Sequence, residues 1–140
     1  MPAAMAGACA AAITPKEILV MGGFSQATND YIDLAFTFNT ATHEWVTKHM
    51  AYKIQNGHRL DLSCYNVNWN SDKYVLIAGG WNNTATTSTE LVSTDKKFYP
   101  VRRHSSQDNI QQPLPLNIRS AAMTELNKIP ILAGGVLCSG

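Results

Sequence analysis

A hydrophobic run that ends in two glycines occurs three times in this chain. The runs end at Gly22-Gly23, Gly79-Gly80 and Gly134-Gly135, so their first glycines are 57 and 55 residues apart. A near-constant period of about 50 residues indicates one structural unit that is repeated, and some β-propeller blades recur at this spacing. We therefore expect a fold built from three copies of one unit.

Each glycine pair ends the second of two short apolar segments that a polar turn separates. The paired segments are residues 6–13 with 18–21, 60–69 with 74–78, and 117–124 with 129–133. Two apolar segments joined by a few polar residues are typical of an antiparallel β-hairpin. The second segment of each pair is nearly continuous in Ile, Leu and Val, which predicts a strand buried on both faces.

After the first two glycine pairs the sequence becomes polar and predicts loops. Two further strands are expected after each of these loops, and no segment shows the 3.6-residue periodicity of a helix. The predicted fold is all-β, with four antiparallel strands in each complete repeat. The loops are residues 24–30 and 81–88, and the further strands are 32–38, 44–47, 90–93 and 98–101. The repeats span about residues 1–50, 58–101 and 115–140, and the last one is truncated.

These features resemble the kelch repeat, whose four strands form one blade of a β-propeller. In that family the first strand begins near a proline and a basic residue, as at Pro115 and Arg119. The second strand ends in Gly-Gly, the third begins near an acidic residue such as Glu90, and the fourth carries a tryptophan such as Trp45. The resemblance implies an incomplete propeller of about two and a half blades, because a closed propeller needs about four to eight.

The chain departs from the kelch pattern at a few positions. Phe98 stands where tryptophan is expected, and Met5 and Ala8 replace the usual arginine and histidine. The small residues at 6–12 and 120–122 still fit the pattern, since the innermost strand of a wedge-shaped blade has little room for side chains.

Composition and charge argue against several classes of function. The net charge is +1 and 15% of residues are charged, without the basic patch of a nucleic-acid-binding protein. The longest apolar stretches, residues 3–13 and 129–138, are shorter than the roughly 20 residues of a membrane helix. The amino-terminal region lacks the positive charge that opens a signal peptide. The cytoplasm is thus slightly favoured, although the sequence leaves the compartment open.

The three cysteines, Cys9, Cys64 and Cys138, show no metal-ligand spacing. Cys9 and Cys64 precede their glycine pairs by 13 and 15 residues, so they occupy similar places in successive repeats. We interpret them as small buried thiols; an oxidised pair is the alternative and would favour a secreted protein. Asn82 begins an Asn-Asn-Thr glycosylation sequon, which matters only in a secreted protein.

No pattern typical of catalysis is present. The glycine pairs match no phosphate-binding loop, and no G-x-S-x-G motif occurs. The histidines have no cysteine or carboxylate at metal-ligand spacing, and they are His43, His49, His58 and His104. We therefore expect no catalytic residue, no metal site and no cofactor, and a protein that is not an enzyme.

The predicted function is that of a protein–protein interaction module. The kelch resemblance implies that a partner contacts the segments after the second strand and those that lead into the next repeat. The predicted ligand-binding residues are accordingly Arg59, Trp81, Asn82 and Arg119. Tryptophan and arginine dominate interface energetics. In the alternative interpretation Trp81 packs between repeats and Arg119 pairs with a neighbouring acid.

Two further expectations stay open. The chain could instead be a fragment of a kelch-type secreted enzyme or carbohydrate-binding protein, although it supplies no catalytic or metal-binding set. Self-association is expected if the chain is natural at this length, because the flanks of an incomplete stack expose apolar strands.

Overall fold

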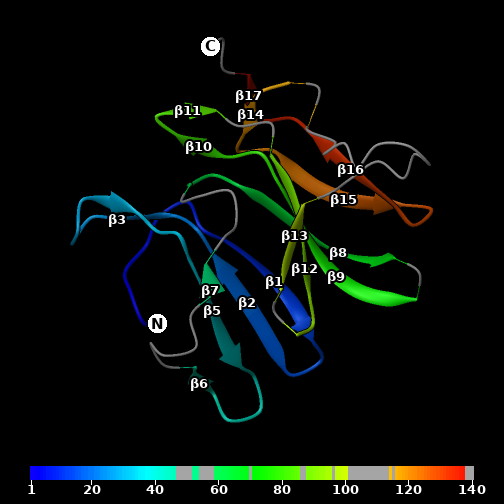
Figure 1. Cartoon of the computed structure of the whole chain (residues 1–140), viewed down its shortest axis with the longest axis horizontal. Coiled ribbons are helices and arrows are strands. Elements are labelled where there is room, and N and C mark those ends of the chain that lie inside the picture. The colour runs from blue at the N-terminus through cyan, green and yellow to red at the C-terminus, as the bar shows by residue number, and fades with distance from the viewer. Residues whose placement is uncertain are drawn as a thin grey trace.

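The fold is all-β in the described part of the chain. The computed structural model describes residues 1–46, 52–53, 59–69, 71–85, 88–95, 97–100, 114 and 116–137. Every regular element in these ranges is a β-strand, and neighbouring strands pair antiparallel (Figure 1). Over the same ranges there is no helix long and apolar enough to cross a membrane.

The first repeat forms one antiparallel sheet in the order β1-β2-β5-β6, which matches the four strands predicted for it. β7 pairs with the opposite end of β5 from β6. Trp45 packs on Phe38 of its own sheet, with ring centroids 5.2 Å apart. The strands are β1 (Cys9–Thr14), β2 (Glu17–Met21), β5 (Leu34–Asn39), β6 (Glu44–Trp45) and β7 (Tyr52–Lys53).

The second repeat forms a four-stranded antiparallel sheet, and the third contributes a hairpin. The second sheet has the order β13-β12-β9-β8. Its strands are β8 (Ser63–Trp69), β9 (Asp72–Ala78), β12 (Thr89–Ser93) and β13 (Phe98–Pro100). The hairpin pairs β15 (Ala122–Leu126) with β16 (Ile129–Ala133). Asn127 and Lys128 join them with φ of 52° and 65°, as the tight turns that suit strand twist require.

The segments predicted as loops after the first two glycine pairs are connecting segments that each contain a hairpin of two-residue strands. β3 (Phe24–Ser25) pairs with β4 (Asp30–Tyr31), and β10 (Trp81–Asn82) pairs with β11 (Thr84–Ala85). β3 and β10, which directly follow the glycine pairs, also pair with the start of their own repeats. The bridges are Ala6↔Phe24 and Leu60↔Trp81. In the third repeat, β14 (Ile118–Arg119) pairs with β17 (Val136–Leu137) in the same way.

Backbone hydrogen bonds at the glycine pairs join each repeat to the next. The Gly23 N–H donates to the Arg59 carbonyl at 2.8 Å, and the Gly80 N–H donates to the Ile118 carbonyl at 3.0 Å. We call this set of contacts between consecutive repeats the joint. The same bond at the same place in two successive repeats explains why the glycine spacing is so regular.

A second bond of the joint connects three corner residues. Gly7, Asp61 and Ser120 each turn the chain into its first strand with a positive φ, of 66°, 56° and 55°. The Asp61 N–H donates to the Gly7 carbonyl at 2.7 Å, and the Ser120 N–H donates to the Asp61 carbonyl at 2.9 Å. The corners therefore form a continuous hydrogen-bonded row across the three repeats.

The hydrophobic core lies between the first two hairpins. Successive side chains of a strand point to opposite faces, so each hairpin has two faces. We call the face that looks toward the next repeat the outgoing face and the other the incoming face. The outgoing face of β1–β2 supplies Leu19 and Met21, both 0% exposed, and the incoming face of β8–β9 supplies Val75 and Ile77, also 0% exposed.

Cys9 and Cys64 form a disulfide with Cα atoms 6.0 Å apart, so their interpretation as buried thiols is wrong. The strand register gives the reason. Cys9 pairs with Met21, directly before its glycines, whereas Cys64 pairs with Ile77, one position earlier. This one-residue offset places Cys9 on an outgoing face and Cys64 on the incoming face that meets it. Residues at identical positions would point the same way and would not meet.

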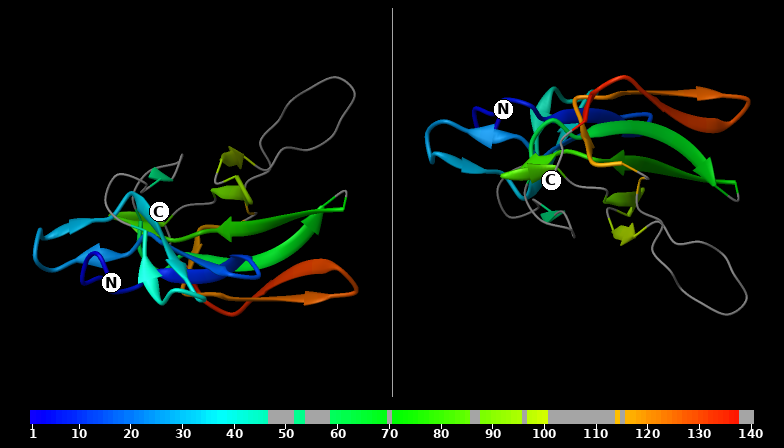
Figure 2. Two further views of the ribbon diagram at one scale, coloured as in Figure 1. Left: turned by 90° about the horizontal axis from the view of Figure 1, so that it is seen from below. Right: turned by 90° about the horizontal axis from the view of Figure 1, so that it is seen from above.

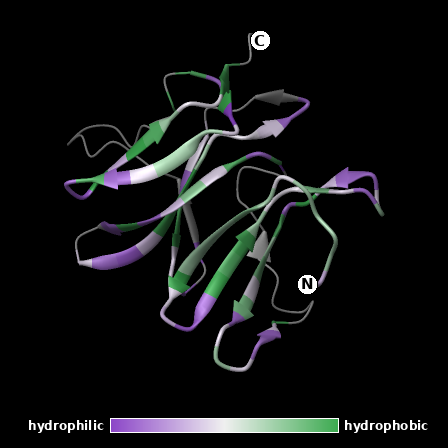
Figure 3. Cartoon of the chain, turned by 180° about the vertical axis from the view of Figure 1, so that it is seen from behind, coloured by the Kyte–Doolittle hydropathy of each residue, from purple (hydrophilic) through white to green (hydrophobic). Residues whose placement is uncertain are grey.

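The expectation that every second strand is buried on both faces is wrong. β2 and β9 each have one buried face, whereas Ile18, Val20 and Leu76 on their other faces are half-buried, and β16 is largely exposed. Ile129 and Ile131 of β16 are 65% and 36% exposed. Figure 3 shows that β2 and β16 are both hydrophobic, with β8–β9 lying between their hairpins. Within the described residues no further repeat covers β16, whereas β8–β9 covers the same face of β1–β2.

The joint predicts different costs for two equivalent glycine substitutions. Gly79 and Gly134 have φ of 65° and 71°, so alanine costs about 1–2 kcal/mol of backbone strain at either position. A Cβ at Gly79 would overlap the Ile118 carbonyl, whereas one at Gly134 meets no described atom within 4 Å. Overpacking should add about 1–3 kcal/mol for Gly79→Ala alone. Urea unfolding of both variants measures the difference, and equal losses would contradict the joint.

Candidate functional site

Three of the four predicted ligand-binding residues lie together at the joint between the second and third repeats. Trp81 and Asn82 form β10, and Arg119 ends β14. The guanidinium carbon of Arg119 lies 4.8 Å from the centroid of the Trp81 ring, within the range of a cation–π contact. We call these three residues, together with Asp61, the Trp81 cluster.

Arg119 also pairs with an acid, as the alternative interpretation expected. Its Nη1 lies 3.6 Å from Oδ2 of Asp61, and the two side chains are 34% and 29% exposed. The Nε atom of Arg119 is buried and has no hydrogen-bond partner within the described residues. The guanidinium is thus held over the indole ring by one long ion pair, with part of its surface open to solvent.

A pair of hydrogen bonds extends this surface toward the first repeat. The Tyr31 hydroxyl donates to Oδ1 of Asn83 at 3.3 Å, and the Asn83 N–H lies 3.4 Å from the same hydroxyl. Tyr31 also packs edge-on against Phe24, with ring centroids 5.5 Å apart. The β3–β4 hairpin lies at the opposite side of the molecule from the tips of β8–β9 and β15–β16 (Figure 2).

Arg59 does not belong to this surface. It is 1% exposed, and its Nη2 lies 2.7 Å from Oε1 of Glu90, which is 0% exposed. Its stem passes beneath Gly80, where its Cδ lies 3.0 Å from an ideal Cβ position. The pair ties the start of the second repeat to β12 of the same sheet, so we assign Arg59 to packing and not to ligand contact.

The pairing of Arg59 with Glu90 was not anticipated from the sequence. The sequence predicts Arg59 as a binding residue and places Glu90 at the start of the third strand, and neither prediction connects the two. The available signal is that each residue stands directly before a leucine, Leu60 or Leu91, and a charge buried beside apolar residues is costly without a partner.

A shallow cavity of about 370 Å³ opens beside the first repeat. Its lining residues are Ala4, Met5, Ala6, Phe24 and Gln26. Phe24 and Gln26 come from the segment that the sequence predicted to contact a partner. The lining is apolar apart from one amide and carries no titratable side chain, so the cavity offers contact area without acid–base chemistry.

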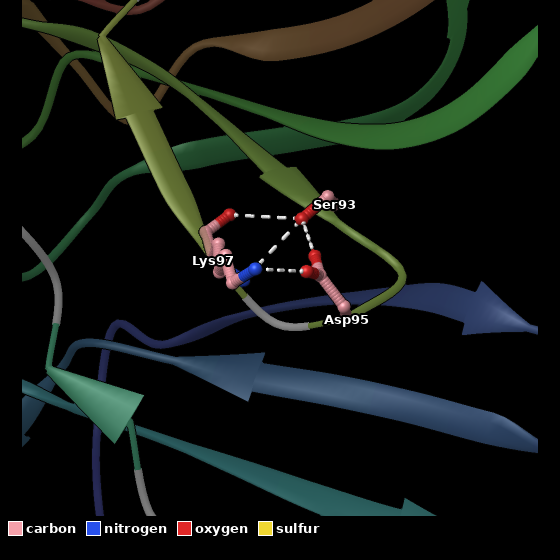
Figure 4. Close-up of polar contacts among 3 residues, drawn as sticks. All are labelled: Ser93, Asp95 and Lys97. Atoms are coloured by element: carbon pink, nitrogen blue, oxygen red, sulfur yellow. Dashed lines mark hydrogen bonds and ion pairs between the residues drawn. The ribbon is translucent and has the colours of Figure 1, made fainter.

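Three polar side chains at the β12–β13 turn contact one another and stabilise the turn, and we do not assign them to a binding site (Figure 4). Lys97 Nζ lies 2.8 Å from Oδ2 of Asp95, and the Ser93 hydroxyl donates to the same carboxylate. The hydrogen bond from Lys97 holds the pKa of Asp95 below its ordinary value, and the Ser93 hydroxyl lowers the pKa further. All three side chains belong to one turn, and Lys97 and Asp95 are well exposed.

The described residues were also considered as a possible metal site. They hold no group of three or more His, Cys, Asp or Glu side chains arranged to bind a metal ion. His43 lies in the exposed turn before β6. The remaining histidines and the third cysteine, His49, His58, His104 and Cys138, lie outside the described residues.

The chain resembles known proteins in its three-dimensional structure and not in its sequence. No protein-family model matches the sequence, and no curated protein matches it. Among solved structures the chain is similar to YjhT, with a TM-score of 0.61 and 10% sequence identity. The match covers 100% of this chain and 64% of the YjhT chain, so this chain spans less than two thirds of that structure. At this identity the likeness supports the all-β fold and nothing further.

The buried ion pair generates a prediction for stability. Glu90→Ala leaves the Arg59 guanidinium buried without its partner, which should cost about 3–5 kcal/mol. The double variant Arg59→Met/Glu90→Leu should lose less than Glu90→Ala, because no buried charge is left. Urea unfolding measures both, with exposed Glu44→Ala as the control. A loss for Glu90→Ala no larger than that of the control would contradict the pairing.

Proposed function

We propose that the chain is a partial kelch-type β-propeller of about two and a half blades that acts as a non-catalytic protein–protein interaction module. Three double-glycine hairpins joined in chain order support the blade assignment, as does the antiparallel meander of the first two repeats.

The observation that carries the binding role is the contact between Trp81 and Arg119. An indole ring with a guanidinium 4.8 Å from its centroid lies at the joint, and both side chains are partly exposed. Such pairs supply large contact area and directional hydrogen bonds, which is why they dominate interface energetics. Asp61 keeps Arg119 in place before a partner arrives.

The geometry favours a particular kind of partner segment. Among the described residues Arg119 has one ion pair, which is long at 3.6 Å, so its guanidinium can donate further hydrogen bonds to a second carboxylate. Arginine binds a carboxylate best through two parallel hydrogen bonds. The proposed ligand is an extended segment that places an acidic side chain on Arg119 and an apolar side chain on Trp81.

The cluster is better suited to binding than to a reaction. Its one carboxylate, Asp61, is committed to Arg119, and general acid–base catalysis needs a group free to take or give a proton. Asn82 adds an amide and no titratable group. We therefore assign it a role in hydrogen bonding to the bound segment.

A second candidate is a secreted carbohydrate-binding protein or a fragment of a secreted enzyme. The Cys9–Cys64 disulfide favours it, since disulfides persist mainly in oxidising compartments. The sequon at Asn82 is compatible with the same compartment. In this case Trp81 would offer its ring to a sugar, and Arg119 would serve as a hydrogen-bond donor.

Peptide selection on the whole chain tests the interaction module. Peptides selected from a random library should be rich in Asp or Glu next to an apolar residue. Trp81→Ala and Arg119→Ala should each weaken their binding by about tenfold or more, as a loss of about 1.4 kcal/mol or more implies for a hot-spot residue. Fluorescence titration gives the affinities.

Matched variants separate binding from folding. Arg119→Lys keeps the positive charge but cannot donate two parallel hydrogen bonds to a carboxylate, so it should bind the peptides weakly. Lys128→Ala, in an exposed turn, is the matched control and should bind them with the affinity of the parent chain. Circular dichroism of all variants should equal that of the parent chain. Undiminished affinity of Trp81→Ala would contradict the proposal, and selective binding of glycans over peptides would favour the second candidate.

A further inference from the structure

The outgoing face of the third hairpin is open and apolar. The register of β15 and β16 places six side chains on one face, because directly paired residues share a face of the sheet. All six are exposed, and they are Ala122, Thr124, Leu126, Ile129, Ile131 and Ala133. Leu126 and Ile129 are 60% and 65% exposed.

The equivalent face of the first hairpin is largely buried. Counted back from the glycines, Ile131 corresponds to Leu19 and Ala133 corresponds to Met21. Leu19 and Met21 are both 0% exposed, whereas Ile131 is 36% exposed. The same position in the same unit is thus core in one repeat and surface in the other. The difference is the presence of a following hairpin.

The third glycine pair has the backbone conformation of the first two, but no described carbonyl accepts a hydrogen bond from it. Gly134 and Gly135 have φ of 71° and 90°, close to the 65° and 100° of Gly22 and Gly23. A Cβ at Gly22 would run into the Arg59 carbonyl of the next repeat, but one at Gly134 would meet no described atom within 4 Å. The backbone is shaped to receive a carbonyl that no described residue supplies.

The opposite end of the stack offers the complementary half. The incoming face of the first hairpin carries Ala10 and Ala12, which are exposed, and Ile18 and Val20, which are half-buried. In the second repeat this face forms one side of the core. The first repeat also has the corner at Gly7, with φ of 66°, that a joint requires.

We propose that the outgoing face of the third hairpin binds the incoming face of the first hairpin in a second copy of the chain. By the repeat register, Gly135 N–H of one copy donates to the Met5 carbonyl of the other. Gly7 N–H of that copy donates to the Ser120 carbonyl of the first. These are the same two bonds that join the repeats within one chain.

Two such contacts close a pair of chains into a ring. A head-to-tail contact either closes or grows into a filament. Two copies supply six hairpins, which lies within the four to eight blades around which propellers close. The proposal is independent of the Trp81 cluster, so failure of peptide binding leaves it standing.

An engineered disulfide tests the register of this contact. Ala122 occupies the position of Cys9, and Ala10 occupies the position of Cys64, relative to their glycine pairs. The variant Ala10→Cys/Ala122→Cys, built on Cys138→Ser, should therefore form an intermolecular disulfide under mild oxidation. A non-reducing gel should show a two-chain band that a reductant removes. The control Ala10→Cys/Lys128→Cys has the same number of thiols and should run largely as a single-chain band, because its two thiols do not meet across the contact.

Light scattering provides a second measurement that needs no cysteine. The parent chain should have twice the 15.3 kDa mass of one copy, and Ile131→Glu should halve that mass with unchanged circular dichroism. A monomeric parent across a dilution series, or crosslinking no stronger than in the control, would overturn the proposal. A mass that keeps growing with concentration would overturn the closed pair.

Discussion

The fold depends on backbone hydrogen bonds from the glycine pairs to the following repeat. Each bond requires that the next chain segment approach where a Cβ would lie, so only glycine fits at Gly22 and Gly79. The row of corner bonds through Asp61 adds a second line of attachment. Side chains then complete the joint, with Leu19 and Ile77 in the core and the Cys9–Cys64 disulfide beside them.

The candidate binding surface is a product of the same joint. Trp81 follows Gly80 directly, and Arg119 follows Ile118, whose carbonyl accepts the Gly80 hydrogen bond. The indole and the guanidinium therefore meet because the two repeats are docked at that point. Arg59, one residue before the equivalent bridge of its own repeat, is covered instead and pairs with Glu90. Position relative to the joint thus decides which arginine can reach a partner.

The sequence predicted the strands well and the relations between repeats poorly. Hydrophobic runs with polar turns marked the hairpins, since burial and turn chemistry are local properties. The ion pair of Arg59 with Glu90 and the disulfide depend on which faces meet, and a one-residue offset between Cys9 and Cys64 decides this. The exposure of Ile131 depends on whether a neighbour follows. No local pattern contains that information.

Native-state hydrogen exchange at the joint tests this account most directly. The amides of Gly23, Gly80, Asp61 and Ser120 should exchange as slowly as those of the central strands β2 and β9, because opening a joint would uncover the core. That result would show that the repeats unfold as one unit. If these four amides exchanged at loop-like rates while β2 and β9 stayed protected, the joints would not hold the structure together and the account would be wrong.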